Sequence, residues 1–375
     1  MNMSIRTTDL KKAISNVAKA ASKRSTMAVL EGIAFKTAED TVTLTAYNME
    51  LGITTNIPAT VKTDGETVLN AKLLQEIVSK LSGEEINISD DGNIATIEAG
   101  DSVYQIPAMK YADFSEPPVV NAKSENIISI EASVLKEMIV RTIYAVADND
   151  TRPVLTGSYF EIEENRLRIV SVDGFRIVYV TKPLKKPLKS KSNPTTGFIV
   201  PGKSLTEIVK LLNGDGDVTI SFTKRHVCFV TNEVTIVTRL IEGDFIEYKN
   251  AIPAETTMTV KVDPKDVVGA CERMGLLIND GIKNPVKCTF ANNSIHFECA
   301  TAIGKVQDTI SAEIEFDGSK NEMTVGFNNN YLKDAFSRLG ADEVQIKLKT
   351  PVNAAIVTTG DTEEFLALIL PVRLS

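Results

Sequence analysis

The sequence contains no tryptophan and, among its 375 residues, only two histidines and four cysteines. The cysteines form no CxxC pair, so the spacing favours neither a zinc site nor a thiol redox motif. Free, mostly buried thiols in a reducing cytoplasm are the simple interpretation. Both histidines, His226 and His296, lie in strand-like runs, and we interpret them as sheet residues rather than catalysts. The cysteines are Cys228, Cys271, Cys288 and Cys299.

Other absences narrow the function further. No apolar run approaches the ~20 residues that span a membrane, and no apolar stretch follows the first charged residues, which argues against a signal peptide. No glycine-rich loop ending in Lys-Ser/Thr is present, so any ATPase activity must belong to a separate protein. Residues 213–217 resemble a calcium loop only superficially and favour a hairpin or helix-end turn. We therefore expect no cofactor and no metal.

The chain repeats a strand–turn–helix segment three times, near residues 68–81, 199–212 and 325–339. The apolar positions of each follow the i, i+3, i+4, i+7 pattern of an amphipathic helix. The second helix begins this pattern 131 residues after the first, and the third 127 residues after the second. The apolar positions are Leu74, Ile77, Val78 and Leu81; Leu205, Ile208, Val209 and Leu212; and Leu332, Ala335, Phe336 and Leu339.

A second amphipathic helix precedes each of these. Its first apolar residues are Leu10, Leu135 and Val267, at offsets of 125 and 132, and Thr142 is the one polar lapse in the pattern. The same two offsets separate Val29, Val154 and Val286. We expect each of these valines to open the strand that follows this helix in its repeat. Agreement between independent landmarks indicates true repetition.

Alternating runs between the helices, at 41–45, 166–170 and 294–298, are typical of strands. Each repeat is therefore predicted to be an α+β domain in which two helices cover one face of an antiparallel sheet. We place the domains at residues 1–122, 123–253 and 254–375 and call them repeats one, two and three.

Charge is segregated along the chain. The net charge is −8, which taken alone argues against a protein that grips nucleic acid. The six helical windows nevertheless carry 15 Lys and Arg against 7 Asp and Glu, so the remaining residues carry a net −16. These windows are 9–24, 72–81, 134–146, 203–212, 264–274 and 330–339.

Two interpretations of this basic helical surface remain open. Lys and Arg are good helix formers and can simply decorate a solvated face. Glu is an equally good helix former, however, and none of the six windows is net negative, which favours a surface for a phosphate backbone. The helices lack aromatic interleaving and base-reading clusters, so DNA binding would occur through phosphates without sequence preference.

Three motifs carry a specific resemblance to a known family. They are Thr151–Gly157 with Ser171–Ile177, Arg239–Tyr248 closing at Pro253, and the terminal Leu368–Leu374. Together with the repeats, which cover essentially the whole chain, they resemble the bacterial DNA polymerase III β subunit, the sliding clamp. The terminal Pro-x-Arg-Leu and the Asp-Gly-x-Arg motif are the most specific of these signals.

The resemblance implies a fold and a set of partners. The fold is three clamp domains per chain, with antiparallel sheets outside and two helices per domain inside, closing as a head-to-tail homodimeric ring. Twelve helices of about 10 Å diameter can surround a hole wider than a DNA duplex. The implied function is processivity without catalysis, in the cytoplasm. The implied partners are duplex DNA, the replicative polymerase, the clamp-loader ATPase and repair factors.

The resemblance also implies residue roles. The implied phosphate contacts are Arg24 and Arg152, with Lys72, Lys203, Lys136, Arg141 and Arg338 as weaker candidates. The implied partner-peptide pocket comprises Leu155, Val172, Gly174, Phe175, Arg176, Ile177, Ile246, Ala251, Leu368, Leu370, Pro371, Val372 and Arg373. An apolar groove of this kind would bury Leu or Phe anchors. The implied dimer contacts are Tyr104, Ile106, Leu276 and Leu277.

Some positions depart from the family pattern. Ile246 stands where many relatives have proline, and Phe175 replaces a polar or smaller residue in some of them. The segment of residues 27–32 in repeat one lacks the proline that is common in the family before Val/Ile-Leu. The shape and peptide preference of the pocket should differ accordingly. Two other functions remain as alternatives: a three-domain peptide-binding scaffold that does not encircle DNA, and an enzyme of unrecognised type, although no cluster of titratable residues supports the latter.

Overall fold

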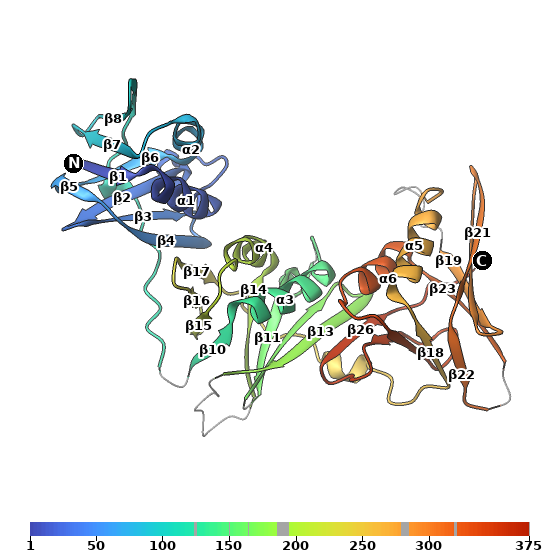
Figure 1. Ribbon diagram of the computed structural model, residues 1–375. Coiled ribbons are helices and arrows are strands. Elements are labelled where there is room, and N and C mark those ends of the chain that lie inside the picture. The colour runs from blue at the N-terminus through green and yellow to red at the C-terminus, as the bar shows by residue number, and fades with distance from the viewer. Residues whose placement is uncertain are drawn as a thin grey trace. The chain divides into compact units, whose positions relative to one another are not determined.

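The computed structural model describes residues 1–123, 126–149, 151–163, 165–185, 195–278, 285–318 and 321–374 (Figure 1). All six predicted helices are present, two in each repeat. They are α1 (Thr7–Val17), α2 (Ala71–Lys80), α3 (Ala132–Thr142), α4 (Gly202–Leu211), α5 (Pro264–Gly275) and α6 (Asn329–Ser337).

The helices bury the faces that the periodicity predicts. In α1 the buried residues include Leu10, Ala13, Ile14 and Val17. The polar lapse at Thr142 has a local explanation, because this side chain is also buried and its hydroxyl donates to the Met138 carbonyl at 2.8 Å. A hydroxyl satisfied within its own helix can occupy an apolar position at little cost.

The prediction that Val29 and Val154 open strands is wrong. Both lie in 3-10 turns, η2 (Ala28–Glu31) and η6 (Pro153–Thr156), and the strands begin at Gly32 and Gly157. At Gly157 a Cβ atom would lie 2.5 Å from the Val200 carbonyl oxygen. The turn therefore ends where a glycine lets the new strand approach its neighbour closely. Val286, in contrast, opens its strand as predicted.

Residue contacts divide the chain into two compact units. Unit one contains the described residues within 1–135, 184–192 and 203–240. Its two antiparallel sheets have the orders β5-β1-β7-β8-β9 and β10-β15-β16-β17-β4-β3-β2-β6. Its strands are β1 (Asn2–Arg6), β2 (Gly32–Ala38), β3 (Thr41–Tyr47), β4 (Leu51–Pro58), β5 (Thr60–Thr63), β6 (Glu66–Asn70), β7 (Glu85–Asp90), β8 (Ile94–Ala99), β9 (Ser102–Pro107), β10 (Ile127–Glu131), β15 (Asp217–Phe222), β16 (His226–Val230) and β17 (Thr235–Arg239).

Unit two contains the described residues within 136–183, 193–202 and 241–375. Its antiparallel sheets have the orders β14-β11-β12-β13-β26-β25-β24-β18-β22 and β21-β20-β19-β23. Its strands are β11 (Gly157–Glu163), β12 (Arg166–Val172), β13 (Arg176–Pro183), β14 (Thr195–Pro201), β18 (Met258–Val262), β19 (Val286–Ala291), β20 (Ser294–Thr301), β21 (Gly304–Ser311), β22 (Glu313–Phe316), β23 (Glu322–Phe327), β24 (Val344–Leu348), β25 (Ala355–Thr358) and β26 (Phe365–Ile369).

Sheets continue from one repeat into the next. Strand β4 of repeat one pairs with β17 of repeat two, with Leu51 opposite Thr238. Strand β13 of repeat two pairs with β26 of repeat three, with Arg176 opposite Ile369. Repeat two therefore shares one sheet with each neighbour, which is why contacts yield two units from three repeats. The boundaries at 122/123 and 253/254 stay a prediction.

The repetition extends to single hydrogen-bonded bridges. One isolated bridge recurs in each repeat, as Val68–Met109, Ile199–Ile241 and Gly326–Val372. The first partners are 131 and 127 residues apart, the same offsets as in the sequence pattern. The three repeats therefore have a common fold down to backbone hydrogen bonds.

Candidate functional site

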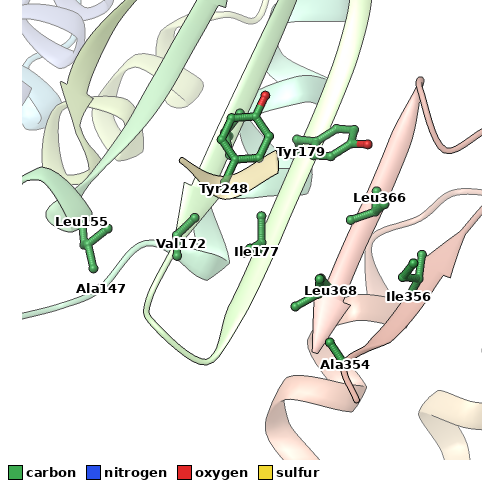
Figure 2. Packing of buried hydrophobic residues seen from close by; sticks show 11 residues of the cluster. Ala147, Leu155, Val172, Ile177, Tyr179, Tyr248, Ala354, Ile356, Leu366 and Leu368 are labelled. Carbon is green, nitrogen blue, oxygen red and sulfur yellow. The ribbon is translucent and has the colours of Figure 1, made fainter. Parts of the chain in front are cut away.

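An apolar cluster in unit two brings together the centre of the predicted pocket. Four predicted residues, Leu155, Val172, Ile177 and Leu368, are buried in it, and Ile246 packs against it half-buried. Figure 2 shows Val172 and Ile177 on the β12–β13 hairpin and Leu368 on the neighbouring strand β26. Residues distant in sequence, which the resemblance assigned to one pocket, thus lie in one apolar cluster that the β13–β26 pairing brings together.

The remaining predicted pocket residues are mostly exposed. Phe175 is 57% and Leu370 41% exposed, and Val372 is exposed as well. The Leu370 amide donates to the Phe175 carbonyl at 2.9 Å, which holds these two residues together. Exposed apolar side chains beside a buried apolar base are typical of a surface that binds a partner. The other exposed residues are Gly174, Ala251 and Arg373, with Pro371 half-buried.

The C-terminal segment after β26 is held at two points. Besides the bond between Leu370 and Phe175, the Val372 amide donates to the Gly326 carbonyl at 2.8 Å. A Cβ atom on Gly326 would lie 2.5 Å from the Val372 carbonyl oxygen and 2.8 Å from Leu374. Glycine at 326 therefore permits the terminal segment to lie against β23.

Arg176 lies under the surface rather than on it. Its guanidinium donates to Asp173 at 2.8 Å, to Asp334 on α6 at 2.7 Å and to the Tyr144 carbonyl at 2.5 Å, and it lies 4.4 Å from the centre of the Tyr331 ring. Burial lowers the pKa of Arg176, but the hydrogen bond to Asp334 and the charge of Asp173 outweigh it, and the pKa rises. The buried cation therefore fixes the turn that carries Gly174 and Phe175.

Several residues of this region were not predicted. Tyr179 and Leu366 alternate with Ile177 and Leu368 along the same two strands, so the period-2 rule could have found them. Tyr248 lies within a motif already singled out. No sequence signal identifies the members contributed by β25 and its preceding turn. The unpredicted buried members are Ala147, Val170, Tyr179, Tyr248, Ala354, Ile356 and Leu366.

The predicted DNA contacts differ in exposure. Arg24, Lys72 and Lys203 are exposed cations in unit one. In unit two, Arg338 is exposed and lies 5.7 Å from the centre of the Tyr144 ring. Arg141 pairs with Glu137 at 3.0 Å and is largely covered, and Lys136 is half-buried.

Arg152 lies beside the candidate peptide surface. A Cβ atom on Gly174 would lie 3.3 Å from its guanidinium nitrogen Nη2. The resemblance assigned Arg152 to phosphate contact together with Arg24, and this role stays a prediction. The structure places Arg152 next to the Gly174–Phe175 turn, a neighbourhood that the sequence alone did not indicate.

Two of the predicted dimer contacts lie on a terminal strand. Tyr104 (38% exposed) and the buried Ile106 are on β9, the terminal strand of its sheet. Leu276 is 81% exposed. Leu277 lies 3.7 Å from the Cβ position of Gly304, which begins β21, the terminal strand of another sheet.

The sequence argued against a metal site, a thiol redox motif and a membrane-spanning segment. Within the described ranges, no three His, Cys, Asp or Glu side chains could together hold a metal ion. The four cysteines are free and buried, as predicted, and burial raises the pKa of the Cys271 thiol to about 12. In the same described part of the chain, no helix is long and apolar enough to cross a membrane.

Solved structures first define the class of protein. A crystal structure of a putative DNA polymerase III beta subunit from Eubacterium rectale matches with a TM-score of 0.92, 31% identity and full coverage of both chains. A sliding clamp from Bartonella birtlesii, solved bound to griselimycin, matches with a TM-score of 0.91, 26% identity and full coverage of both chains. The fold is therefore that of a sliding clamp.

Sequence comparison then identifies the family. Profiles of the N-terminal, central and C-terminal domains of the DNA polymerase III beta subunit match residues 1–118, 129–247 and 249–373. The beta sliding clamp of Halalkalibacterium halodurans is 29% identical over 372 residues, covering 96% of each chain. The chain belongs to the DNA polymerase III beta subunit family, which confirms the resemblance.

Proposed function

We propose that two copies of this chain close head to tail around duplex DNA and tether the replicative polymerase through the apolar surface of unit two. The protein acts without catalysis, and a separate ATPase loads it. The observation that carries this proposal is that β9 of repeat one and β21 of repeat three are terminal strands of their sheets. The strands that correspond to them in the other repeats pair with each other where repeat one meets repeat two and where repeat two meets repeat three.

The correspondence follows from hairpin registers. The pairs Tyr47–Gly52, Val172–Ile177 and Ala300–Lys305 are equivalent, so β4, β13 and β21 correspond. The pairs Ala95–Ile106, Val227–Thr238 and Ala355–Ile369 are also equivalent, so β9, β17 and β26 correspond. Within the chain β4 pairs with β17 and β13 with β26. Terminal strands are templates for pairing with another chain, so β21 is expected to pair with β9 of a second copy.

This correspondence also gives a register. Leu51 lies opposite Thr238, and Arg176 opposite Ile369. Their equivalents are Gly304 and Ile106. Gly304 of one copy should therefore lie opposite Ile106 of the other, and Val306 opposite Tyr104. Two such junctions would close a ring with twofold symmetry.

DNA contact is proposed to be electrostatic and independent of sequence. Arg24, Lys72 and Lys203 are exposed on or beside basic helical segments in an otherwise acidic chain. Such cations neutralise phosphates and release counterions, so binding should weaken as salt rises. The rest of the chain is acidic and should be repelled by DNA phosphates. This charge distribution suits a protein that must slide along DNA without sticking to it.

The apolar surface is proposed to bind a short peptide of the polymerase, the loader or repair factors. Buried Leu155, Val172 and Leu368 supply the base, and exposed Phe175 and Leu370 supply the side walls. Apolar anchors held between such walls are a recurrent form of peptide recognition. Because the Bartonella birtlesii clamp binds griselimycin, griselimycin is proposed to bind this chain as well.

The ring is tested by mass and by topology. The chain has a mass of 40.8 kDa, so light scattering at micromolar concentration should give about twice this value. After loading, the protein should stay on nicked circular DNA during gel filtration and leave it once the circle is linearised. A monomer, or retention that does not change on linearisation, favours the peptide-binding scaffold that does not encircle DNA.

The register is tested by cross-linking. Tyr104→Cys combined with Val306→Cys in one chain should yield covalent dimers under mild oxidation, because directly opposed residues of an antiparallel pair have Cβ atoms about 4.5–5.5 Å apart. The control is Tyr104→Cys combined with Lys305→Cys, which moves one thiol to the opposite face of the strand. Equal cross-linking of both variants contradicts the register.

A further inference from the structure

A buried polar network ties both sides of the proposed peptide site to the sheet beneath it. Its centre is Glu161 on β11, only 5% exposed. The Tyr248 hydroxyl donates to this carboxylate at 2.5 Å, and Lys249 pairs with it at 3.0 Å. Arg168 on β12 lies 3.6 Å from the same carboxylate. This buried carboxylate on β11 thus receives contacts from the neighbouring strand β12 and from the segment that joins repeats two and three.

Tyr248 begins the 3-10 turn η7 (Tyr248–Ala251). Ile246 lies two residues before it, and Ala251 ends the turn. We call Ile246 and Ala251 the linker wall of the site. Phe245 stacks on the Tyr159 ring at 5.0 Å on the N-terminal side. The hydrogen bond from Tyr248 to Glu161 therefore holds the chain at a buried point between Ile246 and Ala251.

Arg168 extends the network to the other side of the site. It donates to Thr181 at 2.8 Å and to Glu363 at 2.9 Å, and its guanidinium lies over the Tyr179 ring at 4.8 Å. The Tyr179 hydroxyl donates to the Thr362 carbonyl at 2.7 Å. Residues 362–363 lead into β26, which carries Leu368 and continues to Leu370. The network therefore connects the linker wall with the strand that supplies the opposite side.

We infer that Tyr248, through its hydrogen bond to Glu161, is a positioning residue that sets the linker wall of the peptide site. The inference rests on the proposed peptide-binding function. A hydroxyl that donates to a buried carboxylate makes a strong, directional bond, and the ring is locked in the apolar cluster. Burial, followed by the hydrogen bond to Glu161, raises the pKa of Tyr248, so the phenol keeps the proton that it donates.

Tyr248→Phe is the direct test, because it removes only the hydroxyl and leaves the ring in place. Glu161 keeps its pairs with Lys249 and Arg168, so the variant should fold and dimerise. We expect it to bind a fluorescein-labelled peptide with Leu and Phe anchors about tenfold more weakly, as measured by anisotropy. The matched control is Tyr111→Phe, which removes a hydroxyl bonded to Glu116 at 2.7 Å in unit one and should leave affinity unchanged.

A double-mutant cycle separates positioning from general loss of stability. If Tyr248 acts through the linker wall, Tyr248→Phe should cost at most about twofold in a chain that already carries Ile246→Ala, because coupled residues are not additive. A full tenfold loss in that background, or a loss no greater than that of Tyr111→Phe, overturns the inference. If Tyr248→Phe has no effect, Leu370→Asp shows which proposal is wrong. Unchanged peptide affinity in Leu370→Asp means that the peptide site itself is wrong. Loss of peptide binding in Leu370→Asp means that the site is right and only the role of Tyr248 is wrong.

Discussion

Replacing Leu370 by aspartate is expected to weaken peptide binding at least about 100-fold, on the order of 3 kcal/mol. The side chain is 41% exposed in the free protein, so a carboxylate there remains hydrated until a partner arrives. A bound apolar peptide would strip water from that charge and offer it no counterion. The loss should appear as an affinity change in anisotropy titrations and as loss of polymerase processivity on a primed circle.

The fold should tolerate this change. The Leu370 contact with Phe175 runs through the backbone amide, which aspartate retains, so dimer mass and DNA retention should match the unmodified protein. Val352→Asp is the matched control, because Val352 is an 81% exposed apolar residue of unit two outside the predicted site. Unchanged peptide affinity in Leu370→Asp, or an equal loss in Val352→Asp, contradicts the assignment of the site.

Introducing aspartate at both Tyr104 and Val306 is expected to open the ring. In the proposed register these residues lie opposite each other across both junctions, and like charges directly opposite in a sheet repel. Together with the desolvation of two carboxylates at the junction, the dimer Kd should rise at least about 100-fold. Light scattering should then report the mass of one chain, and the protein should no longer remain on nicked circles.

A charge swap distinguishes the register from general damage. Tyr104→Lys with Val306→Asp changes the same two positions but places opposite charges face to face, and should restore dimers and retention on circular DNA. Both positions are at least partly exposed in the single chain, so each variant should fold. If the swap fails to rescue while the single chain stays folded, β9 and β21 do not meet in this register.

The helices were predictable because their signal is local. Their burial follows the 3.6-residue period, as in α1 and α2, and even the lapse at Thr142 is resolved within one turn of the same helix. The periodicity also located the three strand–turn–helix segments and their spacing. A pattern confined to one element needs no knowledge of what that element packs against.

The candidate site was predictable only in part. Residues such as Val172 and Leu368 follow from quoted motifs, and both join the cluster. The buried position of Arg176 does not follow from its motif, because its partner Asp334 is 158 residues away. The resemblance assigned Arg176 to the pocket, whereas hydrogen bonds to the neighbouring Asp173 and to the distant Asp334 and Tyr144 hold it beneath the surface. The resemblance likewise assigned Arg152 to phosphate contact, and its proximity to Gly174 became evident only from the fold.

By itself, the sequence determined the threefold repeat, six amphipathic helices, the segregation of positive charge onto them and the family. All of these are recorded in spacing, periodicity and composition. Only the tertiary structure decided that sheets run from repeat to repeat, that Glu161, Arg168 and Tyr248 form one buried network, and which strands of repeats one and three stay terminal in their sheets. Strand pairing and buried ion pairs join residues far apart along the chain, and no local pattern specifies which distant partner each will take.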